Sequence, residues 1–124
     1  MEIIKNILAV GAGSFVGGAA RYLVSLGMKG IVKGFPWATL AVNLVGCLMI
    51  GLLWGLLSRN AAENTSWGLF LTVGLCGGFT TFSTFSKEAI AMLQTGQMWG
   101  FASYIAISVL AGIALVALGY YIAR

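Results

Sequence analysis

Residues 74–88 read GLCGGFTTFSTFSKE, and this stretch limits the folds that the chain can adopt. It overlaps residues 64–86, an uncharged segment that is long enough to cross a membrane. A spanning helix needs about 20 mainly apolar residues. Within the segment, paired glycines at 77–78 stand beside paired β-branched threonines at 80–81, and both residue types disfavour a continuous helix. We therefore predict a membrane-spanning helix that is broken near its middle.

The composition of the whole chain also points to a membrane environment. Of its 124 residues, 60% are hydrophobic and 8% are charged, and the mean hydropathy is +0.97. A soluble domain carries about 25% charged residues, so this chain is expected to be surrounded by the lipid bilayer. Charges divide it into apolar segments, and we predict an all-α, single-domain membrane protein with four transmembrane helices. The expected spans cover residues 7–26, 37–57, 67–93 and 98–122.

The residue inventory excludes several classes of function. There is no His and no Asp, and the only acids are Glu2, Glu63 and Glu88. Histidine chemistry, paired-carboxylate catalysis and carboxylate-rich metal sites are therefore excluded, and we predict that the protein is not an enzyme. The net charge of +4 is thinly spread, so binding to nucleic acid is not expected. Cys47 and Cys76 are interpreted as inert buried thiols, although two cysteines permit one disulfide.

Small residues recur at helical spacing in three of the expected spans. Gly13 and Gly17 are four residues apart in the first span, and Gly51 and Gly55 are four apart in the second. Helices in lipid associate through close backbone approach, which small residues permit. Together with Gly112 and Gly119 in the fourth span, these glycines predict tight helix packing, which we expect a 13.0 kDa chain to reach by forming an oligomer.

The basic residues do not decide the orientation of the chain in the membrane. Lys and Arg normally gather on the cytoplasmic side. Here both sides carry similar numbers, which leaves two interpretations open: one orientation wins by a small margin, or the chain inserts both ways and pairs antiparallel with itself. One side carries Lys5, Arg59 and Arg124; the other carries Lys29 and Lys33, joined by Arg21 and Lys87 if these reach that interface.

Breaking a helix inside the bilayer frees backbone carbonyls. Such groups need protein or a cavity to satisfy them, and unwound carbonyls in membrane proteins can coordinate Na⁺. The residues alone leave two interpretations, a kink satisfied by Thr and Ser hydroxyls or a cation site, and they slightly favour the kink.

Polar groups near the break suggest a path for an anion. Phe82 and Phe85 are three residues apart and share a helix face amid several hydroxyls. Aromatic ring edges are electropositive, so two rings can stabilise a small anion without a fixed cation; ordinary packing is the alternative interpretation. Thr39 and Asn43 share a face of the second span, where a carboxamide is a candidate functional group or an interhelical hydrogen bond. Tyr104 and Ser108 extend the polar track in the fourth span.

Two motifs together resemble a known family. The sequence Asn43-Leu44-Val45-Gly46, followed by GGFTTFSTFS at residues 77–86, closely resembles the Fluc/CrcB family of bacterial fluoride channels. The resemblance covers the whole chain, including its length and four spans, with Val73 as a mild departure where the family often carries Thr.

The resemblance implies a passive fluoride channel of the bacterial inner membrane that relieves fluoride toxicity. It implies an antiparallel, dual-topology homodimer with two fluoride pathways. It also implies a structural, non-transported Na⁺ held by the backbone carbonyls of Gly77 and Thr80 from both chains, which favours the cation site over the kink. The resemblance assigns Asn43, Phe82 and Phe85 to the fluoride pathways, with Ser83, Thr84 and neighbouring hydroxyls as a polar track. The residue pattern adds Thr39 and Tyr104 to the expected pathway. It places the charges of Arg21, Lys87 and Glu88 in a vestibule or in a structural role.

Two other classes remain as alternatives. Small multidrug exporters are four-span antiparallel dimers of similar size, but they depend on a carboxylate within the first span, which here has none because Glu2 lies outside it. The other alternative is a non-conducting membrane subunit in which the break and the hydroxyls are purely structural.

Overall fold

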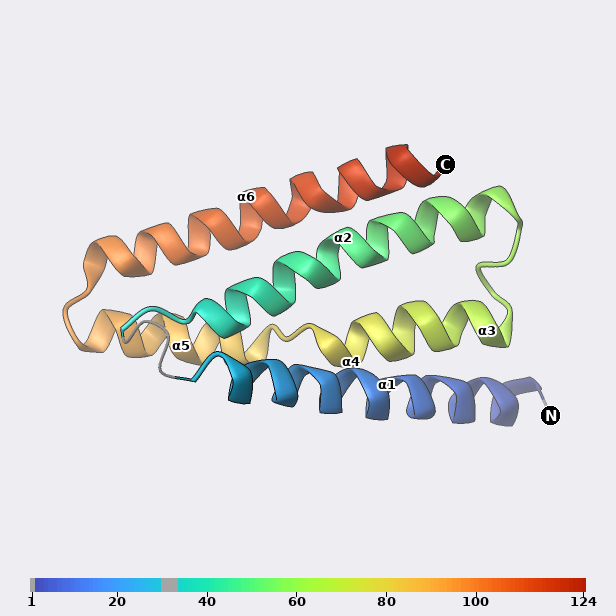
Figure 1. Cartoon of the computed structure of the whole chain (residues 1–124), viewed down its shortest axis with the longest axis horizontal. Coiled ribbons are helices and arrows are strands. Elements are labelled where there is room, and N and C mark those ends of the chain that lie inside the picture. Colours follow the sequence, from blue (N-terminus) through green and yellow to red (C-terminus); the bar gives the residue numbers. More distant parts are fainter. Residues whose placement is uncertain (1, 30–33) are drawn as a thin grey trace.

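The computed structural model describes residues 2–29 and 34–124 and is helical almost throughout (Figure 1). The prediction of an all-α protein is confirmed, and the described residues form four helical segments long and apolar enough to span a membrane, the third of them broken. Helices α1, α2 and α6 each form one span, and the third span consists of four segments in line. The elements are α1 (Glu2–Gly27), α2 (Trp37–Arg59), α3 (Ser66–Leu69), the π-helix η1 (Phe70–Cys76), α4 (Gly77–Phe79), α5 (Ser83–Gln94) and α6 (Met98–Ala123).

Each span is long and apolar enough to cross a membrane, and each of the four predicted ranges lies inside one of them. The beginning of α1, the end of α6 and the α2–α3 connection lie at one end of the structure, and the end of α1, the beginning of α2 and the α5–α6 connection lie at the other (Figure 1). Lys5 lies near the beginning of α1 and Lys29 follows its last residue, so the two lie at opposite ends of this helix, as expected. Lys33, which the orientation argument also used, is outside the described residues.

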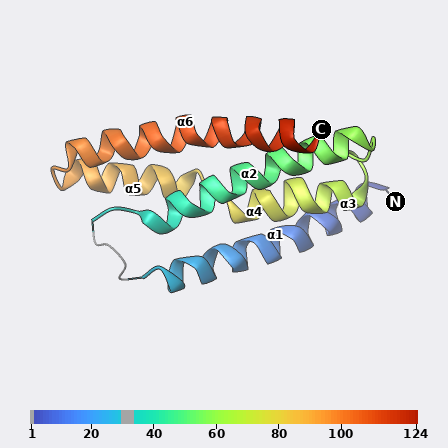
Figure 2. The same cartoon turned by 45° about the horizontal axis from the view of Figure 1, so that its top comes forward.

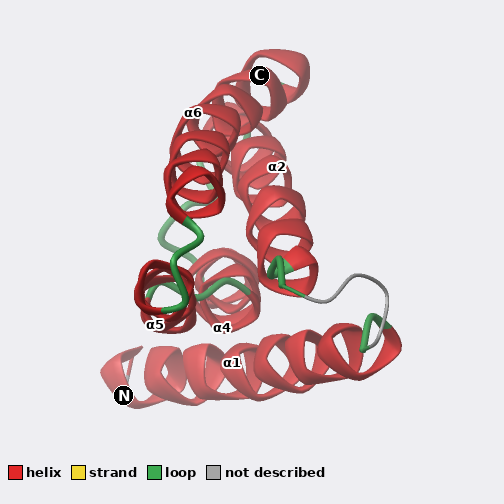
Figure 3. Cartoon of the chain, turned by 90° about the vertical axis from the view of Figure 1, so that its left-hand side faces the viewer, coloured by secondary structure: helices red, strands yellow, loops and turns green. Residues whose placement is uncertain are grey.

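The four spans form two pairs. Helix α2 packs along α6, and α1 packs along the first half of the third span (Figure 2). Seen from the end, α1 crosses beneath α4 and α5 while α2 and α6 rise away from it (Figure 3). A small apolar core joins the pairs near the α5–α6 connection, where Leu40, Ala89, Met92 and the fully buried Tyr104 pack together.

Glycines bring α1 into direct backbone contact with the third span. A Cβ atom on Gly13 would lie 2.8 Å from the Leu75 nitrogen, and one on Gly17 would lie 2.8 Å from the Phe79 nitrogen. Both distances are too short for real Cβ contacts, so only glycine allows this approach. Gly74 and Gly78 face α1 in the same way, which makes the contact reciprocal.

Glycines also allow close backbone contact between α2 and α6. Gly51, Gly55 and Gly119 are buried where these two helices cross. The sequence linked these glycines and the pair in α1 to an oligomer. In the structure they serve packing within one chain, because each of their missing side chains makes room for a backbone of the same chain.

The third span departs from a regular helix twice. Its π-helix η1 was not predicted, and it ends directly before the glycine pair. The break lies at Thr80 and Thr81, where the Thr80 backbone is extended (φ −84°, ψ 162°), whereas Gly77 and Gly78 remain helical. The threonines therefore form the break, and Gly78 provides close approach to α1.

Few residues of α1 and α6 are fully buried by the chain itself. Only 11% of the most apolar stretch of α1, and the same share in α6, is buried, against 33% in α2. Large apolar side chains such as Phe15 and Leu110 are exposed on the outer faces. These faces suit lipid or another apolar helix surface.

The glycine contact predicts a sharp difference between two adjacent positions of α1. Gly17→Ala should lower the free energy of unfolding by about 1–3 kcal/mol, because its methyl group meets the backbone of the third span. Gly18→Ala is the matched control, since nothing lies within 4 Å of a Cβ there, and it should be neutral or slightly stabilising. Thermal unfolding of both variants in detergent tests this, and equal stability would contradict the packing described here.

Candidate permeation site

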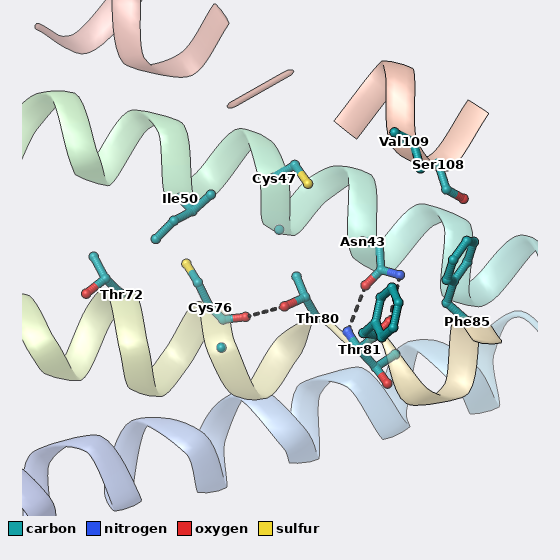
Figure 4. Close-up of a pocket in the computed structure, with 13 residues that line it drawn as sticks. Asn43, Cys47, Ile50, Thr72, Cys76, Thr80, Thr81, Phe85, Ser108 and Val109 are labelled. Carbon is teal, nitrogen blue, oxygen red and sulfur yellow. Dashed lines mark hydrogen bonds between the residues drawn. The ribbon is translucent and has the colours of Figure 1, made fainter. Parts of the chain in front are cut away.

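An open pocket of about 390 Å³ lies between α2, the broken third span and α6 (Figure 4). Of the described residues that line it, none carries a charge. The pocket brings together five of the predicted site residues, from elements far apart in sequence. The lining residues are Asn43, Gly46, Cys47, Ile50, Thr72, Cys76, Gly77, Thr80, Thr81, Phe82, Phe85, Ser108 and Val109.

The carboxamide of Asn43 makes two hydrogen bonds to one residue at the break. Its Nδ2 donates to the Thr81 carbonyl at 3.0 Å, and its Oδ1 accepts the Thr81 backbone N–H at 2.8 Å (Figure 4). The side chain thus replaces the helical partners that Thr81 has lost. Because an amide group carries two N–H hydrogens, one donor of Asn43 remains for another acceptor. The interhelical bond that the sequence allowed is present, and it leaves donor capacity at the pocket.

The close approach of α2 to the break comes from Gly46. This residue is buried against the methyl group of Thr80, so a side chain there would displace the break. Asn43 lies three residues earlier on the same helix, and this spacing directs both positions to one side. The motif Asn43-Leu44-Val45-Gly46 therefore supplies the bonding group and the space that it needs.

Some carbonyls around the break have a hydrogen-bond partner within the described residues, and others do not. Thr80 closes the preceding helix, with both its backbone N–H and its hydroxyl donating to the Cys76 carbonyl at 3.0 Å. Arg21 donates to the Gly78 carbonyl from the α1 side. The carbonyls of Gly77 and Thr80 accept no hydrogen bond among the described residues, because the amides one turn later, on Thr81 and Thr84, are bonded to side chains.

Phe82 and Phe85 lie side by side at the beginning of α5. Their ring centroids are 5.9 Å apart with an interplanar angle of 44°, so they are tilted rather than stacked. Phe85 also contacts the Tyr104 ring at 5.0 Å, which fixes it from the protein side. Phe82, in contrast, is 79% exposed.

The hydroxyl residues of the predicted track are not all gathered in the pocket. Thr39 is buried and does not line it, and Ser83 is exposed on α5. Thr84 takes part through its backbone, whose N–H donates to the Thr81 hydroxyl at 3.2 Å and so supports the start of α5. Tyr104 is fully buried beneath Phe85 and does not reach the pocket surface.

The three charged candidates lie in different surroundings. The Nε of Arg21 donates to the Gly78 carbonyl at 3.3 Å, and the Tyr104 hydroxyl donates to Glu88 Oε1 at 3.0 Å. Lys87 is exposed on the neighbouring face of α5. From the sequence, the charge of Glu88 was expected in a vestibule or in a structural role. In the structure α5 continues to Gln94, and Glu88 faces the buried Tyr104.

Two groups at the site gain importance from the structure. Thr81 is the residue that Asn43 binds, but it acts through its backbone, and no spacing rule reveals a backbone partner on another helix. Ser108 lines the pocket, and its buried Oγ has no hydrogen-bond partner among the described residues. In the sequence, only its position four residues after Tyr104 indicated that Ser108 belongs to the polar track. Cys47 and Cys76, both free thiols, complete the apolar wall.

Comparisons with known proteins give a consistent result. The family described as "CrcB-like protein, Camphor Resistance (CrcB)" matches residues 8–120. A protein of Desulfotalea psychrophila named "Fluoride-specific ion channel FluC" is 43% identical over 124 residues, 100% of this chain and 96% of that protein. Proteins of the same name from Phocaeicola vulgatus (42% over 122 residues) and Prosthecochloris aestuarii (38% over 123 residues) cover 98% and 99% of this chain and 100% and 96% of their own length.

The aligned length includes every element of the site. Residues 8–120 contain the Asn43 motif, the broken third span and Ser108, so the match does not rest on a single helix. The resemblance first seen at residues 43–46 and 77–86 is confirmed, and the chain belongs to the CrcB-like family.

Proposed function

We propose that the protein is a passive, fluoride-selective anion channel that lets cytoplasmic fluoride leave the cell. The observation that carries this proposal is the uncharged pocket at the break, where the Asn43 carboxamide lies beside the paired rings of Phe82 and Phe85. Relatives aligned over nearly their whole length are named fluoride-specific ion channels, which supports the same conclusion. That family consists of channels rather than enzymes, as the residue inventory predicted.

The pocket offers weak donors of several kinds to a dehydrated anion. These are the second N–H of Asn43, the hydroxyl of Ser108 and the electropositive ring edges of Phe82 and Phe85. A fixed cation would bind fluoride tightly and hold it, whereas conduction requires weak binding at several places. A narrow path lined in this way favours fluoride over chloride, because the smaller ion needs close partners to replace its water.

A passive pore is sufficient for the physiology. Hydrogen fluoride is a weak acid that crosses membranes in its neutral form and ionises in a less acidic cytoplasm. The trapped anion then leaves through the pore, driven by an inside-negative potential worth about 2.3 kcal/mol per charge per 100 mV. The pathway requires no ATP site and no proton-coupling acid.

The working unit in this proposal is an antiparallel homodimer with two pathways. Three observations support a second copy: the pocket is open on one side, Phe82 is 79% exposed, and much of each span is uncovered. A second chain packed against this face would enclose the pocket and cover Phe82. The nearly equal numbers of basic residues at the two ends suit insertion in both orientations.

A structural Na⁺ belongs to the same proposal. The carbonyls of Gly77 and Thr80 fit such a role, because the break leaves both without a hydrogen-bond partner among the described residues. When bound, the ion would satisfy these carbonyls and join the two broken helices of a dimer.

The alternatives make different predictions for protein reconstituted in liposomes. A channel gives a fast fluoride leak that is independent of a proton gradient and not matched by chloride. An exporter gives proton-coupled efflux of an organic cation, and a non-conducting subunit gives neither signal.

Replacing either aromatic ring tests the proposed pathway. Phe82→Ile or Phe85→Ile should lower fluoride flux by about tenfold or more, because the ring edge that faces the anion is lost. Phe15→Ile is the matched control, since Phe15 is 78% exposed on α1, away from the pocket, and it should conduct normally. Size-exclusion chromatography checks assembly. Normal flux in both variants would refute a role for the rings.

Asn43→Asp tests the carboxamide. The substitution removes both N–H donors and sets a carboxylate against the Thr81 carbonyl, so flux should fall by about tenfold or more. The control is Asn64→Asp in the exposed α2–α3 connection, which should leave liposome flux unchanged. Wild-type flux in Asn43→Asp would remove this residue from the pathway.

Biasing the insertion of the chain tests the antiparallel dimer. Gln94→Lys with Gln97→Lys adds positive charge at one end, and Asn60→Lys with Asn64→Lys adds it at the other (Figure 1). Each double variant alone should insert one way and lose activity, and co-expression of the two should restore it. Full activity of either variant alone, together with uniform insertion, would contradict the antiparallel arrangement.

A further inference from the structure

Arg21 is a charge that lies inside a membrane span. It is six residues before the end of α1, which is about 9 Å along the helix axis. A charged side chain at such a depth is costly and generally has a specific partner. The described contacts give Arg21 one polar partner, the Gly78 carbonyl, which its Nε reaches at 3.3 Å.

The packing of α1 directs this side chain to the break. Gly17 lies one helical turn before Arg21 on the same face, and it sits against the backbone of Gly78 and Phe79. Ser14 contacts Gly78 from the same helix. These contacts bring the backbones of α1 and α4 together. As a result, the Arg21 guanidinium donates to Gly78, which lies two residues before Thr80, the first extended residue.

The break is thus bonded from two opposite sides. Asn43 on α2 binds Thr81 from the pocket side, and Arg21 on α1 binds Gly78 from the other side. Gly77 lines the pocket and Gly78 does not. Phe79 and Thr80 lie between the two bonded residues, and Phe82 directly follows Thr81, so a shift of either bond would displace groups that face the pocket.

We propose that Arg21 is a positioning residue for fluoride permeation, which acts by donating a hydrogen bond from Nε to the Gly78 carbonyl rather than by attracting the anion with its charge. The inference rests on the proposed channel function. It assigns to α1 a direct part in shaping the pocket, although α1 contributes no residue to the lining.

Because Nε is the donor atom, substitutions can separate the hydrogen-bonding role of Arg21 from the role of its charge. Because the hydrogen bond uses Nε, the Nε2 of a glutamine at this position is the same number of bonds from Cα and keeps the donor without the charge. Lysine keeps the charge but has a methylene at that place, and methionine has neither. Lys5→Met, on an exposed residue of the same helix, is the control for loss of one positive charge.

The experiment compares these variants for fluoride flux in liposomes and for amide hydrogen exchange over residues 77–84. We expect Arg21→Met and Arg21→Lys to lose flux by about tenfold or more and to exchange faster at the break, with α6 unchanged. Arg21→Gln and Lys5→Met should retain flux within about threefold and show wild-type exchange. Size-exclusion chromatography confirms that each variant is assembled.

Three outcomes would overturn the proposal. If lysine retains flux and glutamine loses it, Arg21 acts through its charge. If all three Arg21 variants conduct like the wild type, it has no part in permeation. If flux falls without faster exchange at residues 77–84, the residue does not position the break. A wild-type protein that carries no fluoride would instead refute the channel function, and hydrogen exchange would still report whether Arg21 stabilises the break.

Discussion

The hydrogen bonds between the Asn43 carboxamide and the backbone of Thr81 are the interaction on which the site depends. In hydrocarbon, an unbonded backbone N–H or carbonyl is costly, so a helix can be broken there only where other groups replace the lost partners. Asn43 supplies a donor and an acceptor to one residue, much as a neighbouring peptide group would. With the break stabilised in this way, α5 begins at Ser83 in a position that sets Phe82 and Phe85 beside the pocket.

Close packing of backbones makes this interaction possible. Gly46 lets α2 approach Thr80, and Gly17 lets α1 approach Gly78, so the break lies between two helices that touch it directly. Without a hydrophobic driving force between helices in lipid, such contacts and the polar bonds that they permit hold the bundle together. The glycines and the polar residues therefore act as one system.

The same constraint bears on the character of the pocket, whose described lining residues carry no charge. Because the Asn43 carboxamide is bonded to Thr81, the donors left over at the pocket are weak ones: one amide hydrogen, a serine hydroxyl and ring edges. Glu88 and Arg21 are bonded to Tyr104 and Gly78 and do not line the pocket. An environment of weak partners suits an ion that must enter, move and leave.

The sequence by itself determined the four spans, the broken third helix and the family, because hydropathy, the scarcity of charge and a long motif are local properties of the chain. It also identified Asn43, Phe82 and Phe85 as residues of interest. Only the tertiary structure decided that the break falls at Thr80 and Thr81 rather than at the glycines, and that Ser108, but neither Thr39 nor Tyr104, lines the pocket. The physical reason is that the helical partners lost by Thr81 are replaced by a group from another helix, and sequence spacing describes neighbours on one helix but not the partners that packing brings together.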